Sequence, residues 1–252
     1  RYCHRSHIIP MPSSQLPGPT NLVDLSIIIP TWRASQSISG LFDDLKRECN
    51  GAEIIISNAG YDDYVKPLAV QYGARVLSGP KGRGQQLHTG ALAAHGAWLL
   101  ILHGDSRLPR GFGAAIRDHR QSFPDSAGYA SLRFNSNDWR ARLIAHGANL
   151  RSRIFALPYG DQGLLIPRWL YDDIGGYPIW PLMEDVELVR KLVKAHGRGS
   201  LRPLKTSIIT SPERYQRDGY LKRAMRNLDC LRDFLNGVPI EDITRRYYDV
   251  AE

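Results

Sequence analysis

Cysteine is scarce in this 252-residue chain, and long apolar runs are absent. Its three cysteines, Cys3, Cys49 and Cys230, lie far apart and form no C-x-x-C pair, which argues against a disulfide framework or a cysteine metal site. No stretch approaches the ~20 apolar residues that span a bilayer, and no apolar segment follows the charged start as it would in a signal peptide. These absences predict a cytoplasmic protein.

Acidic residues are also in the minority. The 33 lysines and arginines outnumber the 25 aspartates and glutamates, which gives a net charge of +8 and a pI near 9.5. An excess of positive charge favours an anionic partner, and composition alone leaves nucleic acid, anionic lipid and phosphorylated metabolites open. With 42% hydrophobic residues, a chain of this length can form one α/β domain with additions.

Most of the chain alternates between apolar runs and helical periodicity. A proline-rich stretch predicts an extended lead-in over residues 1–24, with Met11 as a candidate natural start. Strands are predicted over 25–29, 53–57, 74–77, 98–102, 127–134, 163–166 and 206–210. Helices are predicted over 36–49, 62–72, 85–95, 138–156 and 184–195, with two more at the end. Strands that alternate with helices form a mostly parallel sheet, so we expect an α/β fold.

One strand carries the most informative signal. The apolar run Leu99 to Leu102 gives way to His103, Gly104 and Asp105. A short continuous apolar run is typical of a strand buried on both faces, and open α/β sheets bind ligands at the carboxyl ends of their strands. A carboxylate there can hold a divalent cation and, through it, a phosphate. Asp105 is therefore a candidate metal ligand.

Two further segments could act on an anionic substrate. The loop over 80–84 follows a strand and opens a helix, so its backbone could approach a diphosphate that Lys81 and Arg83 would neutralise. Its glycine pattern fits neither a P-loop nor the dinucleotide fingerprint, and a surface turn is the alternative. Glu184 and Asp185 begin a predicted helix, where a carboxylate is suited to metal binding or general-base work; ordinary helix-start acids are the alternative.

Two further pairs of polar residues are candidates for contact with a substrate. Asp161 and Gln162 precede a predicted strand, where they form a turn or contact a substrate. Arg214 and Tyr215 follow the last predicted strand, and a cation beside an aromatic ring could bind a phosphate or a sugar face. A plain strand-end loop explains that pair equally well.

The order and spacing of these segments resemble glycosyltransferase family 2, over roughly residues 25–249. The resemblance is greatest to its small branch of radical-SAM/selenodomain-associated transferase 2 proteins. The motifs that carry it are Ser-Ile-Ile-Ile-Pro-Thr, Asn-Ala-Gly, Gly-Pro-Lys-Gly-Arg-Gly, Leu-His-Gly-Asp-Ser-Arg-Leu-Pro, Gly-Asp-Gln, Gly-Gly-Tyr-Pro, Pro-Leu-Met-Glu-Asp-Val-Glu-Leu and Ser-Pro-Glu-Arg-Tyr.

The resemblance implies a GT-A (Rossmann-like) fold that binds a nucleotide-sugar, usually with Mg²⁺ or Mn²⁺. Residues 25–106 would form the nucleotide-binding half and 107–215 the acceptor half, followed by C-terminal helices over 216–252. The residues that match the nucleotide-sugar side are Pro30, Thr31, Asn58, Gly60, Lys81, Arg83, Gly104 and Asp105. Asn58 replaces an aspartate that accepts the uracil N–H. Its amide oxygen can still accept that bond but carries no charge, so the resemblance favours a UDP-sugar only weakly.

The resemblance also assigns the chemistry. Asp105 matches the last aspartate of the D-x-D metal motif, and His103 stands at its first position, a donor set that suits Mn²⁺. Asp185, preceded by Glu184, matches the catalytic base of an inverting transfer. Asp161, Gln162, Arg214 and Tyr215 fall on the acceptor and phosphate side. Ser211 replaces a glutamine of processive members, which argues against a polymerase.

Two other function classes remain as alternatives. A sugar-phosphate nucleotidyltransferase would carry a glycine-rich basic loop after its first strand, where this chain has Pro30-Thr31-Trp32-Arg33. A non-catalytic protein could instead dock on anionic lipid through a basic cluster, and the same cluster suits a transferase whose acceptor is a lipid phosphate at the inner membrane face. The cluster is Arg214, Arg217, Lys222, Arg223 and Arg226. Few aromatic residues lie among these cations, which disfavours nucleic acid.

Overall fold

One seven-stranded sheet forms the centre of the protein, in the order β3-β2-β1-β4-β6-β5-β7. The computed structural model describes residues 22–32, 37–60 and 65–249; most of the predicted lead-in, and Arg33, lie outside them. The strands are β1 (Leu25–Thr31), β2 (Glu53–Ala59), β3 (Arg75–Gly79), β4 (Trp98–Ile101), β5 (Ala127–Phe134), β6 (Leu164–Pro167) and β7 (Leu201–Thr210).

Strand directions divide the sheet. β3, β2, β1 and β4 are mutually parallel. β6 runs antiparallel to both β4 and β5, while β5 and β7 are parallel to each other. The predicted α/β architecture with a mostly parallel sheet is confirmed. The fully buried strand expected at Leu99 is β4, although its two neighbours run in opposite directions.

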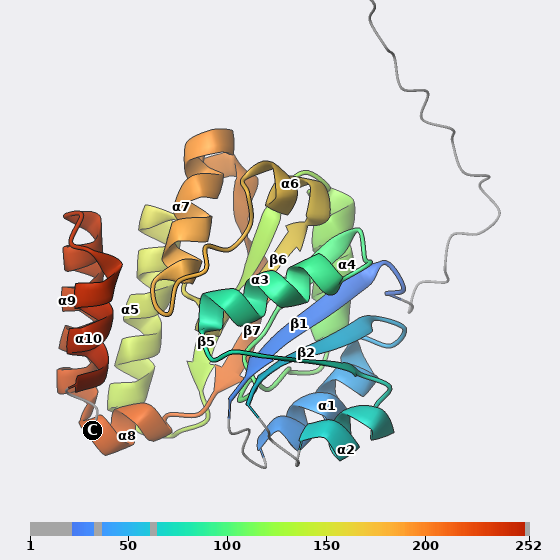
Figure 1. Cartoon of the computed structure of the whole chain (residues 1–252), viewed down its shortest axis with the longest axis horizontal. Coiled ribbons are helices and arrows are strands. Elements are labelled where there is room, and N and C mark those ends of the chain that lie inside the picture. The colour runs from blue at the N-terminus through green and yellow to red at the C-terminus, as the bar shows by residue number, and fades with distance from the viewer. Residues whose placement is uncertain (1–21, 33–36, 61–64, 250–252) are drawn as a thin grey trace, which may run out of the picture.

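Helices cover both faces of this sheet (Figure 1). They are α1 (Ser37–Glu48), α2 (Val65–Gln71), α3 (Arg83–Ala93), α4 (Phe112–Ser122), α5 (Trp139–Phe155), α6 (Arg168–Asp173), α7 (Glu184–His196), α8 (Glu213–Asp218), α9 (Tyr220–Leu235) and α10 (Ile240–Asp249). Successive side chains of a strand point to opposite faces, so Ile27 and Ile29 join a core with α1, α2 and α4, whereas Ile28 joins the core of α3, α6 and α7.

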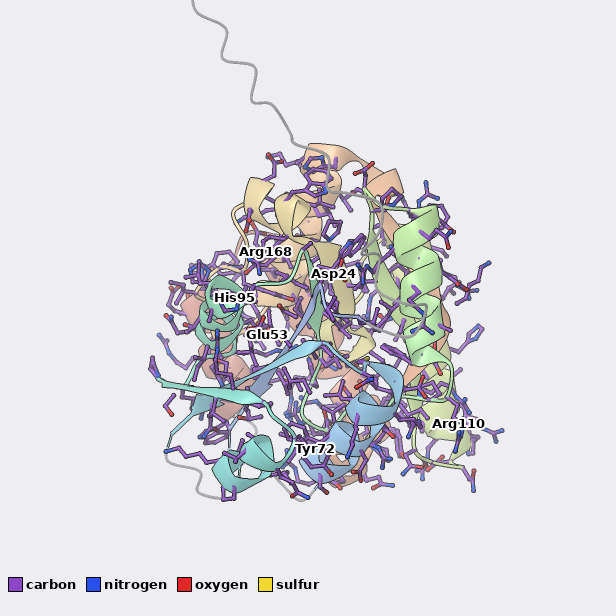
Figure 2. All side chains as sticks on the ribbon, turned by 90° about the vertical axis from the view of Figure 1, so that its right-hand side faces the viewer. Asp24, Glu53, Tyr72, His95, Arg110 and Arg168 are labelled. Carbon is purple, nitrogen blue, oxygen red and sulfur yellow. The ribbon has the colours of Figure 1, made fainter. Side chains whose placement is uncertain are left out.

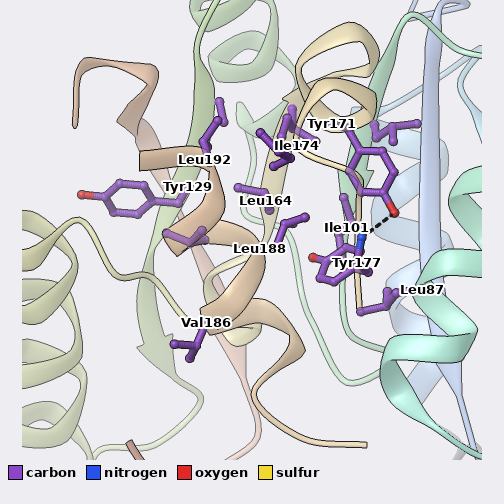
Figure 3. Close-up of a cluster of buried hydrophobic side chains, with 14 of the residues drawn as sticks. Leu87, Ile101, Tyr129, Leu164, Tyr171, Ile174, Tyr177, Val186, Leu188 and Leu192 are labelled. Carbon is purple, nitrogen blue, oxygen red and sulfur yellow. Dashed lines mark hydrogen bonds between the residues drawn. The ribbon is translucent and has the colours of Figure 1, made fainter. Parts of the chain in front are cut away.

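The α7 core fixes the helix that begins at Glu184. Val186, Leu188 and Leu192 of α7 lie in one buried cluster with Ile101 and Leu164 of the sheet (Figure 3). The Tyr171 hydroxyl accepts a hydrogen bond from the Tyr177 N–H, at 3.1 Å, which ties the segment before α7 to α6. The first turn of α7 is therefore held against the strand ends.

A polar network holds the opposite, amino-terminal edge of the strands. Glu53 accepts hydrogen bonds from the Ser26 hydroxyl at 2.5 Å and the His95 N–H at 2.8 Å. Arg168 donates to the Gly96 and Ala94 carbonyls at 2.8 and 2.7 Å. Figure 2 shows Glu53, His95 and Arg168 gathered in this region. Because these groups bind one another, the network is structural.

Several elements were not predicted or began elsewhere. Helices α4 and α6 were not predicted, and the chain ends with three helices where two were expected. β7 begins at Leu201, five residues before the predicted strand, because its first half contains Pro203 and charged residues that resemble a loop. β7 is an edge strand, and an edge tolerates a proline that a central strand does not.

Three arginines of the predicted basic cluster share one carboxylate. Asp218 pairs with Arg217 at 2.9 Å, Arg223 at 3.0 Å and Arg226 at 3.7 Å. Arg223 is buried and also contacts the Tyr247 hydroxyl. These contacts fix α8 to α9 and α10. Arg214 and Lys222 of the cluster are exposed, so an anion-binding role for the cluster stays a prediction. In the described part of the chain, no helix is long and apolar enough to cross a membrane.

Candidate functional site

The site begins where β1 and β2 end side by side. Thr31 lies opposite Asn58 in the parallel register, and the Thr31 hydroxyl donates to Asn58 Oδ1 at 3.0 Å. The Asn58 amide group donates to the Gly60 carbonyl at 3.3 Å, and the Asn58 side chain is fully buried. An amide oxygen can accept two hydrogen bonds, so the Thr31 contact occupies only one acceptor position of Asn58 Oδ1. The uracil contact of this buried side chain stays a prediction.

Gln86 holds those strand ends in place. Its side-chain amide, reaching from α3, donates to the Thr31 and Ser57 carbonyls, each at 2.7 Å. Pro30, the other residue expected near the nucleoside, lies opposite Ser57. Gln86 could not be predicted as a site residue, because a glutamine in a predicted helix is ordinary until the fold places it beside the two strand-end carbonyls.

The glycine loop is the start of a helix. α3 begins at Arg83, and the Gly84 N–H donates to the Trp180 carbonyl at 2.9 Å. A Cβ at Gly84 would overlap the Pro178 carbonyl and lie 2.5 Å from that of Trp180. Exposed Lys81 lies over the Trp32 ring, with Nζ 3.5 Å from the ring centroid. The loop therefore links the end of β1 to the segment that leads into α7.

Arg83 joins three of the predicted motifs. Its Nε lies 2.7 Å from Glu184 Oε1, and its Nη2 contacts His103 Nε2. A Cβ at Gly160 would overlap the Arg83 guanidinium and lie 2.9 Å from His103 Nε2. Gly160 begins the 3₁₀ helix η1 (Gly160–Gln162). The absence of a side chain at Gly160 is thus what lets these groups meet.

The electrostatics of this cluster follow from burial. The Glu184 side chain is only 2% exposed; burial raises the pKa of Glu184 above its usual range, Arg83 opposes the rise, and Asp185 adds to it. Burial and the cations Arg83 and Arg214 hold the pKa of His103 well below its usual range. Neutral His103 can accept a hydrogen bond from Arg83, which leaves its Nε2 unavailable to a metal ion. The predicted metal role of His103 does not fit this geometry.

Asp185 is the carboxylate that faces the open side of this cluster. Its Oδ2 accepts a hydrogen bond from the Gly160 N–H at 2.6 Å, and its Oδ1 accepts one from the Val186 N–H at 2.8 Å. Unlike Glu184, Asp185 is only partly buried. Two backbone donors from α7 and η1 therefore orient a carboxylate that solvent or a substrate can still reach.

Asp105 and Asp161 are two further carboxylates near Asp185. The Thr210 hydroxyl donates to Asp105 Oδ2 at 3.2 Å, while the buried Oδ1 of Asp161 has no hydrogen-bond partner among the described residues. Burial raises the pKa of Asp161 to about 6; Arg151 opposes the rise, and Asp185 and Asp105 add to it. Gly104, beside Asp105, lies against Thr31.

The acceptor-side residues fall into two groups. Gln162 is fully buried, accepts from the Ser152 hydroxyl at 2.6 Å and donates to the Ala130 carbonyl at 3.1 Å. It belongs to the framework, so a direct acceptor contact by Gln162 does not fit the structure. Arg214 is exposed. Tyr215 packs edge-on against Phe134, with 5.3 Å between ring centroids, and burial raises its pKa to about 12.

Arg151 lies beside the site, although the sequence predicted only that it belongs to a helix. Its guanidinium stacks on Tyr159, 3.4 Å from the ring centroid, and its Nε donates to the Leu157 carbonyl at 3.0 Å. The buried Arg151 Nη2 has no hydrogen-bond partner in the described chain. A cation that lowers the pKa of Asp161 and keeps an unpartnered donor is suited to an anionic group.

We expect the Asp161→Asn variant to be more stable than the wild type above pH 6. The folded-state pKa of Asp161, about 6, exceeds that of an unfolded aspartate, so the folded protein binds the proton more tightly. The wild type therefore loses stability as the pH rises from about 4 to about 6. Asparagine carries no charge to bury, and because Asp161 is partly exposed we expect a gain in Tm of roughly 2–4 °C at pH 8.

Thermal unfolding of both proteins at pH 4 and pH 8 measures this effect. The gain should nearly disappear at pH 4, where Asp161 is protonated in the folded protein and so carries no buried charge. The exposed Asp125→Asn variant is the control and should behave as the wild type at both pH values. An equal gain at both pH values would show that the charge of Asp161 is not the cause.

The side chains of the site supply only some of the ligands that a divalent cation needs. Within the described residues, no group of three or more His, Cys, Asp or Glu side chains could hold a metal ion by itself. Asp105 is one partly exposed carboxylate at a strand end, and Mg²⁺ is commonly bound by one or two carboxylates together with substrate phosphates. The donor set therefore suits a cation that arrives with, or is shared by, a diphosphate.

Solved structures with the same fold come from Mycobacterium tuberculosis. Glucosyl-3-phosphoglycerate synthase in complex with Mn²⁺, UDP and glucosyl-3-phosphoglycerate gives a TM-score of 0.55 at 14% identity, over 81% of this chain and 77% of that chain. Its complex with Mn²⁺, UDP-glucose and phosphoglyceric acid gives 0.54 at 14% identity, over 74% and 71%. This likeness confirms the GT-A fold.

The sequence itself gives the family. No curated protein matches the chain. The family model described as "Glycosyl transferase family 2" matches residues 26–171, more than half of the length, and these residues include the β1, glycine-loop, Asp105 and Asp161 segments described above. The chain belongs to glycosyltransferase family 2.

Proposed function

We propose that this glycosyltransferase moves a sugar from a nucleotide-sugar, favouring UDP-sugars, to a hydroxyl acceptor with inversion at the anomeric carbon. The observation that carries the proposal is the convergence of Arg83, His103, Gly160 and the Glu184–Asp185 pair at the carboxyl ends of the strands. The structural neighbours that bind UDP and UDP-glucose support a nucleotide-sugar of this kind.

Asp185 is suited to act as the base. It takes the proton from the acceptor hydroxyl while the hydroxyl oxygen attacks the anomeric carbon, and the bond from that carbon to the diphosphate breaks. The nucleoside diphosphate leaves from the face opposite the attack, so the configuration inverts. The Gly160 and Val186 N–H groups fix the direction of the carboxylate, and a positioned base typically contributes ~10²–10⁴-fold.

The basic residues are suited to the departing diphosphate. Exposed Lys81 on Trp32 lies at the rim beside the end of β1, and Arg83 lies between Glu184 and His103. Buried Glu184 acts as a positioning residue that keeps the Arg83 guanidinium in place. A Mg²⁺ or Mn²⁺ ion bound by Asp105 would offset negative charge on the leaving group.

The acceptor side favours an anionic or polar acceptor. Arg151 keeps a buried unpartnered donor, Arg214 is exposed nearby, and both lie close enough to shift the pKa of a site residue. Tyr215 offers an aromatic surface beside them. We propose that the acceptor carries a phosphate or carboxylate that these cations bind. The structure offers no observation that favours a nucleotidyltransferase instead.

A thermal-shift series tests the nucleotide-sugar assignment. We expect a UDP-sugar with Mn²⁺, at about 100 times its Kd, to stabilise the protein by about 2.7 kcal/mol, which raises the Tm by roughly 5–10 °C. GDP-, ADP- and dTDP-sugars are measured alongside. The shift should depend on Mn²⁺ in the wild type and lose that dependence in Asp105→Ala.

The matched control for Asp105→Ala is the exposed Asp125→Ala, which should keep the metal-dependent shift. If the Mn²⁺-dependent part of the Tm shift were as large in Asp105→Ala as in the wild type, Asp105 would have no metal role. If no nucleotide-sugar of any class shifted the Tm, the proposed substrate class would be wrong.

A further inference from the structure

Helix α5 exposes an apolar stripe on the side away from the protein core. Its buried residues, Ala141, Ala145 and Ser152, lie on one side of the helix. Trp139, Leu143, Leu150 and Ile154 follow helical spacing on the opposite side and are exposed, Trp139 at 66%. Phe155, at the end of the helix, is 68% exposed. Exposing such a row of apolar side chains to water costs free energy, and a contiguous patch of this kind marks an interaction surface.

Helix α9 repeats the pattern beside it. Its buried side chains are Arg223, Cys230 and Phe234. The opposite side carries four exposed apolar residues at spacings of four, three and seven, which are Leu221, Met225, Leu228 and Leu235. Arg140 at the start of α5 lies over the ring of Tyr220 at the start of α9, 4.9 Å from its centroid. The two helices therefore begin at the same end and lie side by side (Figure 1).

The charges around these stripes have one predominant sign. α5 contains four arginines and no aspartate or glutamate. Arg142 and Arg153 of α5 and Lys222 of α9 are exposed and form no ion pair with a described residue. The exposed acid of α9, Asp229, pairs with Arg232 at 3.3 Å. A second copy packed on this face would bring the cations of two α5 helices together, whereas an anionic surface would complement them.

We propose that the exposed faces of α5 and α9 dock on an anionic membrane surface. Helices that lie in the membrane interface insert leucines among the acyl chains and place arginines at the headgroups, as these helices could do, and Trp139 at the start of α5 adds an aromatic residue to the stripe. Of the 214–226 cluster this contact uses only Lys222, since Arg217, Arg223 and Arg226 pair with Asp218.

The docking face and the catalytic cluster share a helix. The Ser152 hydroxyl of α5 donates to Gln162 of η1, the turn that also carries Gly160 and Asp161. Ser152 lies on the buried side of α5, so docking through the exposed side would place this one helix between the bilayer and η1. The proposal does not depend on the proposed transfer reaction, because binding to vesicles is measured without any sugar or nucleotide.

Co-sedimentation with lipid vesicles tests the proposal on the full chain. We expect the wild type to sediment with phosphatidylcholine vesicles that contain phosphatidylglycerol, and far less with phosphatidylcholine alone. Replacing three stripe residues (Leu143→Ser, Leu150→Ser and Leu228→Ser) should lower the partition coefficient at least about tenfold. Leu92→Ser, which changes an equally exposed leucine of α3, should bind as the wild type.

A second variant separates charge from apolar contact. Arg142→Gln with Arg153→Gln should reduce binding to the anionic vesicles and leave binding to neutral vesicles unchanged. Failure of the wild type to sediment with anionic vesicles at low salt, or equal binding by the serine variant, would overturn the proposal. Light scattering that shows a dimer abolished by the serine substitutions would assign the face to a second copy instead.

Discussion

The Asp185→Asn variant should turn over at least about a hundredfold more slowly than the wild type and bind nucleotide with unchanged affinity. The asparagine side chain keeps the size and one oxygen of the carboxylate, so the hydrogen bond from the Gly160 N–H can persist. It cannot take a proton from the acceptor, and a positioned base contributes ~10²–10⁴-fold. The measurement is the rate of sugar transfer with saturating nucleotide-sugar, together with nucleotide affinity from titration calorimetry.

Glu187→Gln is the matched control for this variant. Glu187 lies in the same first turn of α7, so its loss changes the charge of the helix start by the same amount. It should retain nearly the full rate. An Asp185→Asn rate above about a tenth of the wild-type rate would mean that another group removes the proton.

Gly160→Ala should inactivate the enzyme, and it should also lower the Tm because the buried Glu184 loses its Arg83 partner. The added methyl group would overlap the Arg83 guanidinium and approach His103 Nε2 to 2.9 Å. Both obstacles are ends of side chains, which can turn aside without unfolding the backbone. Moving Arg83 breaks its contact with Glu184, and a misplacement of about 1 Å in such a site costs ~10²-fold in rate.

Gly147→Ala gives the comparison for Gly160→Ala. Gly147 lies within α5, and a Cβ there would meet nothing within 4 Å. We expect full activity and a slightly higher Tm, since alanine favours a helix over glycine. Transfer rates and thermal unfolding of the two variants measure the difference. A fully active Gly160→Ala protein would show that the Arg83 position is unimportant for the reaction.

The sequence predicted the parts of this site better than their connections. The apolar run before Asp105 and the helix start at Glu184 depend on local periodicity, and both were found where expected. Asn58 and Gln162 have side chains typical of binding sites, but the fold buries both and satisfies their amides internally. Burial depends on which segments pack together, and no local pattern encodes that.

Long-range pairing explains the other differences. Arg83 was expected at a diphosphate, and the structure adds Glu184 and His103 as its partners from α7 and the end of β4. These partners are 101 and 20 residues away in the chain, so only the three-dimensional arrangement reveals them. Similarly, the basic cluster over 214–226 is visible in the sequence, but only the structure shows that Asp218 pairs with three of its arginines.

The position of β6 limits how this protein can be divided. β6, from the second half of the chain, pairs with β4 along its whole length and is fully buried. If the chain were cut after β4, that four-residue strand would become an apolar edge with unpaired backbone groups, and such an edge is a template for aggregation. A protein engineer who wishes to graft the nucleotide-side segments onto another acceptor module must therefore carry β6 along, or redesign the exposed edge with charges.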